Sequence, residues 1–471
     1  MTVKLRLNLQ TLTLLVVLGL LATTILAALH PKQAHADDLP VTHVSGTLSS
    51  NQTWTSGQVY VVDGNVRVSS GATLTIEAGA VVKGNTGGYI VTVGSGGTLV
   101  VEGAENNPVV FTSFKDDSIG GDSNSDGSSS GTYGDYGVAV FVENGATNAT
   151  INIEGAEFRN ATLAYDMNCS YSSNVNGVTT GSTFKSGVRF SNCPKEASIF
   201  RLNTFDVGQG YALENNNSDT SEFALAGSGR NTMNGSGQSS TLLLMNARVP
   251  SGSTWDIQNA KLVTYYLTVE GTLNIGSGTI VKPVQGNAGV LLQHNGSLTV
   301  DGTASAPVVF TSFRDDSHGG DINGDGSSTT PAVDDYGSAV AFSGTDASLS
   351  MSNVEIYYPA TAIQIPYAPS GQVSLTDMSI NSAYNGIEAG YGNVVFRGTM
   401  SNVSDKFIRA CEWYSGACSV DATYSGWGVW TALRVRFAAK LLPCPGNITV
   451  PLTKAIFLPR TAPAPLPPTK N

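Results

Sequence analysis

The chain has 471 residues, a formal net charge of −11, 53 glycines and 5 cysteines, and 13% of its residues are charged. A soluble domain usually carries about 25% charged residues, and this composition is too apolar for a disordered polyelectrolyte. The length excludes a mini-protein held together by disulfides. The sequence shows no heptads and no glycine at every third position, which excludes a coiled coil and collagen.

The first 36 residues have the pattern of a secretory signal peptide. Lys4 and Arg6 form a short basic region, the stretch Thr11–Leu29 is uncharged, and residues 34–36 read Ala-His-Ala, an A-x-A cleavage site. We therefore expect a secreted protein, located outside the cell or on a cell surface, that keeps no membrane span after cleavage. The alternative is an uncleaved anchor, because the uncharged run is nearly long enough to span a bilayer.

The central part of the chain is strongly acidic. The signal region holds 3 basic residues and the segment after Gly428 holds 6, so 16 basic residues remain beside all 36 acidic residues in between. Such a surface should repel nucleic acid and anionic lipid, and it should attract cations.

Two long stretches of the chain repeat each other. Gly71–Lys83 matches Gly271–Lys282 with one residue fewer, and Pro108–Ser118 matches Pro307–Ser317. Self-similarity of this kind indicates a duplicated structural unit. We therefore divide the chain into a signal peptide (1–36), a first copy (37–242), a second copy (243–428), and a C-terminal cap with a Pro-rich tail (429–471).

Short alternating runs of apolar residues fill each copy. Examples are Leu74–Ile76, Val91–Val93 and Leu99–Val101, with glycine and asparagine clusters between them. Alternation predicts strands, and Gly and Asn predict turns. Strands this short are stable when each pairs with the next coil of a solenoid and fills a narrow core. The sequence thus predicts an all-β protein, a parallel β-helix. An antiparallel sandwich is the alternative, but its hairpins usually have two-residue turns, and the turns here are longer.

A resemblance to known proteins points to the same fold. The segments Val44–Leu48, Val61–Val66 and Leu74–Lys83 resemble the opening coils of secreted bacterial right-handed parallel β-helix proteins of the pectate-lyase-like superfamily. The phrase Phe-Thr-Ser-Phe-Lys/Arg-Asp-Asp followed by Gly-Gly-Asp is also familiar from that group. The resemblance covers about residues 44–425. It implies a right-handed coil, but it does not imply one reaction, since this fold carries lyases, hydrolases, adhesins and inert stalks.

The clearest chemical signal is an acidic loop that occurs in both copies with the pattern D-x-N-x-D-G. Oxygen ligands at alternate positions before a glycine converge on one point, as in calcium loops of the EF-hand type. The twelfth position, which is Glu in an EF-hand, is Tyr133 or Ala332 here, and no flanking helix is predicted. We therefore predict a helix-free structural Ca²⁺ site in each copy, with a solvated turn as the alternative. The candidate ligands are Asp116, Asp117, Asp122, Asn124, Asp126 and Asp135 in the first copy, and Asp315, Asp316, Asp321, Asn323, Asp325 and Asp335 in the second.

The cysteines fit an oxidising compartment. Cys169 and Cys193 are 24 residues apart, about one coil of this fold. Equivalent positions on neighbouring coils lie about 4.8 Å apart, within the span of a disulfide. We therefore predict a bridge between them. Of Cys411, Cys418 and Cys444, one must stay unpaired or pair between chains. Buried free thiols are the alternative for all five.

No residue is assigned a catalytic role. The acidic pairs lack the Asn-Thr-Asp, Gly-His-Gly and Arg-x-Lys segments of polygalacturonases, and no Ser-His-Asp set can be assembled. The sequence therefore favours a secreted or cell-surface β-helix with a structural or adhesive role and polysaccharide as a candidate ligand. The alternatives are a polysaccharide lyase or glycoside hydrolase on the same scaffold, and a spacer that binds calcium alone.

Overall fold

The computed structural model describes residues 39–427 except for 170–173, 194–197, 217–221, 224–229, 235–236, 411–417 and 423–425. The predicted signal peptide and the predicted cap and tail lie outside the described residues. Within the described ranges, no helix is long and apolar enough to cross a membrane.

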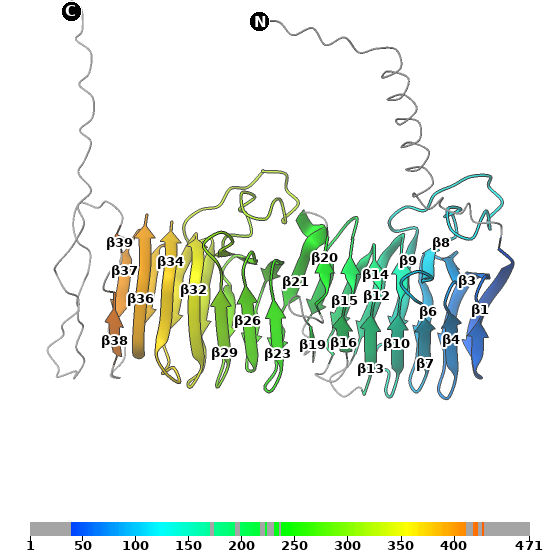
Figure 1. The fold of residues 1–471 in the computed structure, drawn as a ribbon, viewed down its shortest axis with the longest axis horizontal. Coiled ribbons are helices and arrows are strands. Elements are labelled where there is room, and N and C mark those ends of the chain that lie inside the picture. The colour runs from blue at the N-terminus through cyan, green and yellow to red at the C-terminus, as the bar shows by residue number, and fades with distance from the viewer. Residues whose placement is uncertain are drawn as a thin grey trace, which may run out of the picture.

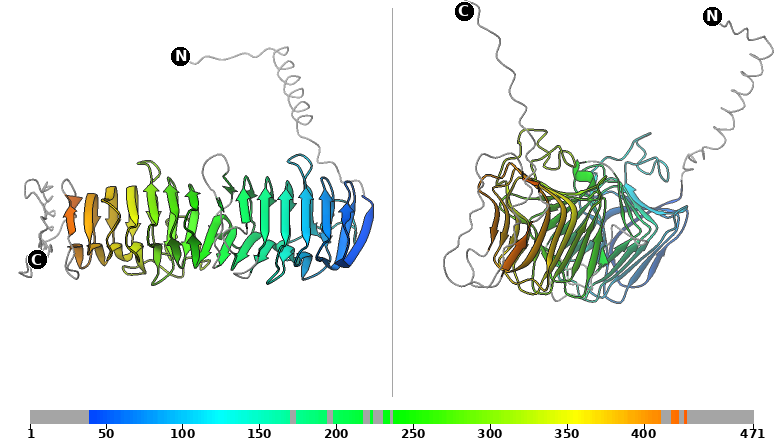
Figure 2. Two further views of the ribbon diagram at one scale, coloured as in Figure 1. Left: turned by 90° about the horizontal axis from the view of Figure 1, so that it is seen from below. Right: turned by 60° about the vertical axis from the view of Figure 1, so that its left-hand side comes forward.

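The described chain is a rod of stacked coils, shown from the side in Figure 1. Each strand pairs in parallel with the strand one coil further along, as where Val59 of one coil lies opposite Val81 of the next. The oblique view on the right of Figure 2 shows that the strands form separate sides around a narrow interior. These features confirm the predicted right-handed parallel β-helix.

Three stacks of strands build the first half of the rod. The first stack contains β2 (Gln52–Trp54), β4 (Thr73–Glu77), β7 (Thr98–Glu102), β10 (Thr150–Glu154), β13 (Asn176–Thr180), β16 (Ser198–Arg201) and β19 (Glu222–Phe223). The second stack contains β1 (Val41–Leu48), β3 (Val59–Val68), β5 (Val81–Gly84), β8 (Val109–Ser113), β11 (Ala156–Phe158), β14 (Thr183–Phe184), β17 (Thr204–Phe205) and β20 (Thr232–Met233).

The third stack runs from the first half into the second. It contains β6 (Tyr89–Val93), β9 (Tyr136–Val142), β12 (Ala161–Asn168), β15 (Gly187–Ser191), β18 (Leu213–Asn216), β21 (Thr241–Met245), β24 (Lys261–Thr264), β27 (Ile280–Pro283) and β30 (Val308–Phe310). A single 3₁₀ turn among the described residues, η2 (Gly237–Ser240), precedes β21.

The rest of the second half forms two further groups of strands. One group contains β23 (Thr254–Ile257), β26 (Thr272–Gly276), β29 (Ser297–Asp301), β32 (Ser348–Tyr357), β34 (Val373–Asn381), β36 (Gly392–Ser401), β38 (Cys418–Asp421) and β39 (Gly426–Trp427). β30 pairs with the second part of β32, so this group and the third stack are joined from β32 onward. The other contains β22 (Ala247–Val249), β25 (Leu267–Val269), β28 (Ala288–Leu292), β31 (Tyr336–Phe342), β33 (Pro359–Ile365), β35 (Asn385–Ala389) and β37 (Lys406–Ala410).

The core is a column of side chains that repeats once per coil. Phe111, Phe158, Phe184 and Phe205 stack in sequence, with ring centroids 4.9, 5.1 and 5.0 Å apart. These spacings match the distance of about 4.8 Å between paired strands, so a ring at the same place in each coil must lie on its neighbour. The alternation seen in the sequence therefore places one residue in two inside the rod.

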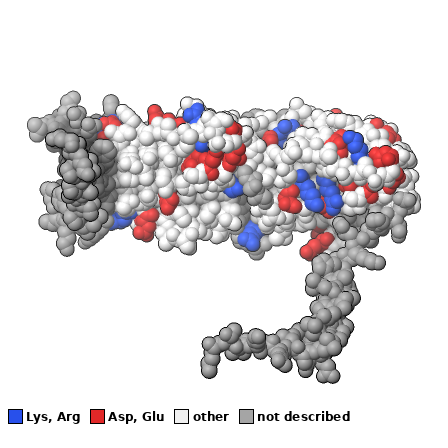
Figure 3. All heavy atoms as spheres, turned by 90° about the horizontal axis from the view of Figure 1, so that it is seen from above, with Lys and Arg blue, Asp and Glu red and all other residues white. Residues whose placement is uncertain are grey.

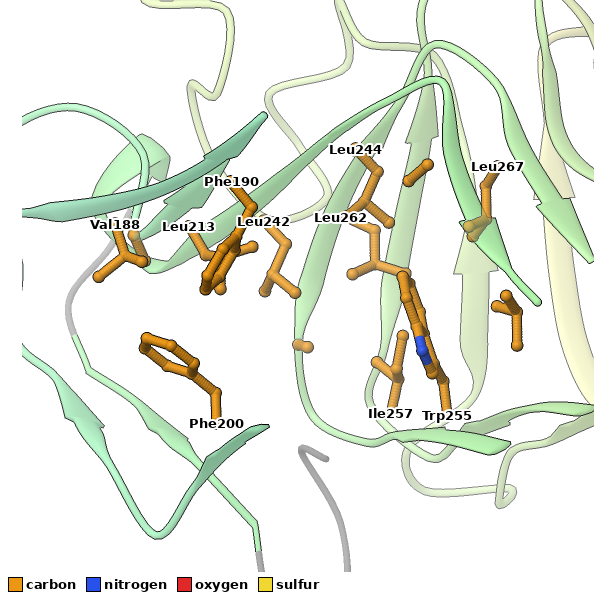
Figure 4. Packing of buried hydrophobic residues seen from close by; sticks show 14 of the residues in the cluster. Val188, Phe190, Phe200, Leu213, Leu242, Leu244, Trp255, Ile257, Leu262 and Leu267 are labelled. Carbon is orange, nitrogen blue, oxygen red and sulfur yellow. The ribbon is translucent and has the colours of Figure 1, made fainter. Parts of the chain in front are cut away.

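The stacking changes at the junction between the two halves. β5 and β27 carry the matching residues Lys83 and Lys282, yet β5 belongs to the second stack and β27 to the third. The change arises because β21 pairs with β18, which places Leu242 opposite Leu213. Figure 4 shows the buried leucines continuing across this junction. The third stack of the first half thus continues through β21 and β24 to β27 in the second half. The tandem duplication itself stays an interpretation.

Cys169 and Cys193 form the predicted disulfide, with their Cα atoms 4.7 Å apart. The bridge joins two successive coils at buried positions. Cys418 lies in β38, but its side chain is outside the described residues, as are Cys411 and Cys444. Their pairing stays open.

Candidate functional sites: two acidic loops and a charged row

The two acidic segments are long loops at corresponding places in the fold. The first connects β8 to β9, and the second connects β30 to β31. Both stand out from the same side of the rod in Figure 1. Each loop turns sharply at a pair of glycines, Gly120 with Gly121 and Gly319 with Gly320, which have φ values between 74° and 82°. Glycine adopts these angles without a steric penalty.

Apolar side chains fix each loop to the outside of the rod. Ile119 packs on the outward residues Val59 and Val81, which form a small buried cluster separate from the main core. In the second half, Ile322 is fully buried, and a side chain at Gly319 would meet both Ile322 and Ile280. Each loop therefore covers apolar surface that the strands would otherwise expose to water.

A buried lysine lies beneath each loop. The Nζ atom of Lys83 donates a hydrogen bond to the backbone oxygen of Gly121 at 2.7 Å. Lys282 donates to the backbone oxygens of Asp315 at 2.6 Å and Gly320 at 3.1 Å. Burial lowers the pKa of Lys282 to about 8, although nearby aspartates oppose that shift. The ammonium groups hold the glycine turns in place, and the carboxylates around them partly offset the cost of burying a charge.

Three aspartates come together in each loop. Asp117, Asp122 and Asp126 each offer a carboxylate oxygen within 4.8 Å of the other two, and so do Asp316, Asp321 and Asp325. Figure 3 shows several groups of acidic side chains on the face of the rod that is seen from above. One oxygen in each group, Oδ1 of Asp117 and Oδ1 of Asp316, is buried and has no hydrogen-bond partner among the described residues.

Backbone hydrogen bonds set the shape of each group. The amides of Asp126 and Gly127 donate to the carboxylate of Asp122. The amides of Asp325 and Gly326 donate in the same way to Asp321. Burial, followed by the charge of Asp321, raises the pKa of Asp316, and the ammonium group of Lys282 opposes this shift only in part.

The other predicted ligands lie in the hydrogen-bond networks of the loops. Asp116 accepts from Thr112, and Asp315 accepts from Thr311. Although burial alone would raise the pKa of Asp315, hydrogen bonds from His318, Ser317 and Thr311 lower it well below its usual range. The remaining four predicted ligands also have protein partners: Asn124 and Asn323 donate to Asp126 and Asp325, and Asp135 and Asp335 accept from Thr132 and Ser312.

A row of outward-facing residues on the third stack was not identified from the sequence. Pairing between neighbouring strands places Phe141 opposite Asp166, Asp166 opposite Arg189, and Arg189 opposite Glu214. Arg189 donates two hydrogen bonds to Asp166, at 2.6 and 3.2 Å. The positions are 25, 23 and 25 residues apart in sequence, so only the strand register reveals that they are neighbours.

Comparison with known proteins agrees with this architecture. Residues 46–125 match the family model described as a pectate-lyase-like β-helix domain. The match covers the first coils and the start of the first acidic loop, and the same parallel pairing continues beyond it to β39. The chain is a parallel β-helix protein. No curated protein and no solved structure matches this β-helix protein, so its sites are interpreted from their own residues.

Proposed function

We propose that this protein is a secreted, calcium-stabilised β-helix rod with a structural or adhesive role at a cell surface. Each acidic loop would hold one Ca²⁺ ion. The observation that carries the proposal is the pair of aspartate groups, Asp117–Asp122–Asp126 and Asp316–Asp321–Asp325, with oxygens of all three residues within 4.8 Å.

The spacing of these oxygens suits a calcium ion. Calcium binds oxygen ligands at 2.3–2.6 Å, so two ligands of one ion lie no more than about 5 Å apart. Three carboxylates would more than balance the double positive charge of the ion, and backbone oxygens or water would complete its shell of six to eight ligands. The buried Oδ1 atoms of Asp117 and Asp316 would gain a partner by binding. Magnesium fits less well, because it requires a strict octahedron and keeps most of its water.

A structural role for calcium follows from where the loops lie. Each loop covers outward apolar residues and accepts hydrogen bonds from a buried lysine. An ordered loop therefore keeps water away from these residues of the rod. An ion that binds only the folded state stabilises that state by about 2.7 kcal/mol per site at a hundredfold excess over Kd.

The surface role is supported by the shape of the molecule and its disulfide. A long rod with a repeated side presents the same kind of surface over many coils, which suits attachment or spacing. The Cys169–Cys193 bridge suits an oxidising, extracellular environment.

The proposal is tested by thermal unfolding of the mature chain, followed by circular dichroism, in EGTA, Ca²⁺ or Mg²⁺. We expect EGTA to lower the melting temperature and Ca²⁺ to restore it better than Mg²⁺. The pair Asp122→Asn with Asp126→Asn should remove about half of the calcium effect, because the two sites are separate. Asp377→Asn, outside both loops, is the matched control. An unchanged melting curve in EGTA would remove calcium from the proposal.

A further inference from the structure

The charged row on the third stack contains a carboxylate that forms no hydrogen bond or ion pair within the part of the chain that the structure describes. Asp166 and Arg189 satisfy each other through two hydrogen bonds. Glu214, the next residue in the row, is partly buried and has no hydrogen bond or ion pair with any residue that the structure describes. The charge of Arg189 attracts Glu214, but burial outweighs this attraction and raises the pKa of Glu214. A half-buried carboxylate that accepts no hydrogen bond loses part of its hydration, so its presence needs an explanation.

The second half of the rod offers a direct comparison. Strand pairing there places Gln364 opposite Glu388 and Glu388 opposite Arg409, in a row that corresponds to Asp166, Arg189 and Glu214. Glu388 forms an ion pair with Arg409 at 2.7 Å and accepts a hydrogen bond from Gln364 at 3.5 Å. In the second half the row holds one carboxylate, and Arg409 binds it. In the first half the row holds two carboxylates, and the one arginine between them is bound by Asp166, which leaves Glu214 without a hydrogen bond among the described residues.

Tyrosines surround the available carboxylate. Tyr133 comes from the first acidic loop, and its hydroxyl lies close to Gly210, the residue before Tyr211. A Cβ atom placed on Gly210 would be 3.6 Å from the hydroxyl oxygen of Tyr133. Tyr211 lies three residues before Glu214 in the same coil, and Tyr265 follows β24 of the same stack, where its amide donates to the backbone oxygen of Leu244 at 3.0 Å. Burial raises the pKa of Tyr211 to about 12, and the charges of Tyr265 and Glu214 add to this shift. Tyr133 and Tyr265 are 40% and 36% exposed.

A further aromatic pair lies at the other end of the row. Tyr89 stacks on Phe141 with ring centroids 4.1 Å apart, and Tyr89 is 39% exposed. The successive strands β9, β12, β15 and β18 therefore present Phe141, the Asp166–Arg189 ion pair and Glu214 in order. The tyrosines near Glu214 come from the loop before β9, from the start of the β18 coil and from the end of β24.

We propose that this row binds a neutral glycan chain, with Glu214 accepting hydrogen bonds from sugar hydroxyls and Tyr133, Tyr211 and Tyr265 contacting the sugar rings. The inference rests on the proposed adhesive role and not on calcium. Tyrosine rings stack on the C–H faces of sugars while their hydroxyls stay in contact with water. Carboxylate oxygens are acceptors only, which matches the donors that a sugar hydroxyl provides.

The charges select a neutral glycan over an acidic one. Asp166 already neutralises Arg189, so the charge that remains in the row is the carboxylate of Glu214. A polyuronate would place further carboxylates beside it, on a chain that is acidic overall. Like charges at such distances repel each other, and the guanidinium of the row, that of Arg189, is already bound by Asp166.

The test is isothermal titration of the calcium-loaded mature chain with hexasaccharides of β-1,4-linked glucose, mannose, xylose and galactose, and with hexagalacturonate as the acidic probe. We expect at least one neutral hexasaccharide to bind with a Kd below about 1 mM, and hexagalacturonate to bind more weakly. Glu214→Gln and Tyr265→Ala should each weaken binding about tenfold.

Tyr384→Ala is the matched control, because Tyr384 is an exposed tyrosine (47%) in the second half, away from the row. It should leave binding unchanged. The inference is overturned if no neutral hexasaccharide binds, if hexagalacturonate binds more tightly, or if the control weakens binding as much as Tyr265→Ala. The melting temperature with and without EGTA, recorded for every variant, reports separately on the proposed calcium role, so the two failures can be distinguished.

Discussion

The ammonium group of Lys282 donates a hydrogen bond to the backbone oxygen of Asp315 at 2.6 Å, from a side chain that has no exposed surface. A second bond to Gly320 holds the glycine turn on the other side of the same ammonium. One buried charge therefore joins strand β27 to the entry of the second acidic loop, and Lys83 joins β5 to the first loop in the same way.

Lys282→Met should destabilise the protein by about 2 kcal/mol, because hydrogen bonds from a charged donor contribute about 1.5–3 kcal/mol and methionine leaves the backbone oxygens without a partner. The measurement is the free energy of unfolding in urea with calcium present. Lys83→Met should have a similar effect, and the double variant should show the sum. Unchanged or increased stability would mean that the lysine is tolerated beneath the loop and does not organise it.

Much of the fold could be predicted from the sequence, because each strand and turn of such a coil is determined by a few consecutive residues. The alternation in Leu74–Ile76 and Leu99–Val101 determines which side chains point inward, and both strands lie in the first stack. The spacing of Cys169 and Cys193 predicted their bridge for the same reason. The change of stack at β18 and β21 could not be predicted, since it depends on how two coils fit together and not on the sequence of either.

Replacing Cys169 and Cys193 by serine should lower the free energy of unfolding by about 3 kcal/mol. The bridge closes a loop of 24 residues, and its loss restores that freedom to the unfolded chain. Urea unfolding of the double variant, compared with the wild type in the absence of reductant, measures this difference. Adding reductant should bring the wild type to the same value, and a wild type that reductant does not affect would contradict the prediction.

Phe158→Ala should destabilise the first half by about 3–5 kcal/mol, because it removes the ring between Phe111 and Phe184 and leaves a cavity in the closed core. Urea unfolding measures the loss. Phe141→Ala, which removes a ring from the outer side of β9, should have a clearly smaller effect. Similar losses from the two variants would show that the column of phenylalanines is not the main source of stability.

Glu214→Gln should stabilise the protein at neutral pH. Burial raises the pKa of Glu214 above its ordinary 4.5, so the folded state holds the proton more tightly than the unfolded state does. The stability contributed by this group is present below pH 4.5 and is lost as the pH rises through the folded-state pKa. Melting temperatures at pH 4 and pH 7 check the sign: the variant should match the wild type at pH 4 and exceed it at pH 7. A variant less stable than the wild type at pH 7 would mean that the carboxylate has a structural partner.

The candidate sites were only partly accessible from the sequence. The repeated D-x-N-x-D-G pattern identified Asp122 and Asp126, because ligands at alternate positions of one loop are visible in a single segment. The pattern did not show that the carboxylate of Asp116 accepts a hydrogen bond from Thr112, since that bond depends on how the loop folds back on β8. The row from Asp166 to Glu214 was missed for a related reason: its members come from separate coils, and isolated charged residues carry no pattern of their own.

The most direct test of the account is the number of calcium ions bound by the mature chain, measured by equilibrium dialysis and metal analysis after removal of metal with EGTA. We expect two ions per chain, one ion after Asp122→Asn with Asp126→Asn, and none when Asp321→Asn and Asp325→Asn are added. Two ions that remain after all four substitutions, or no bound calcium at millimolar concentration, would contradict it.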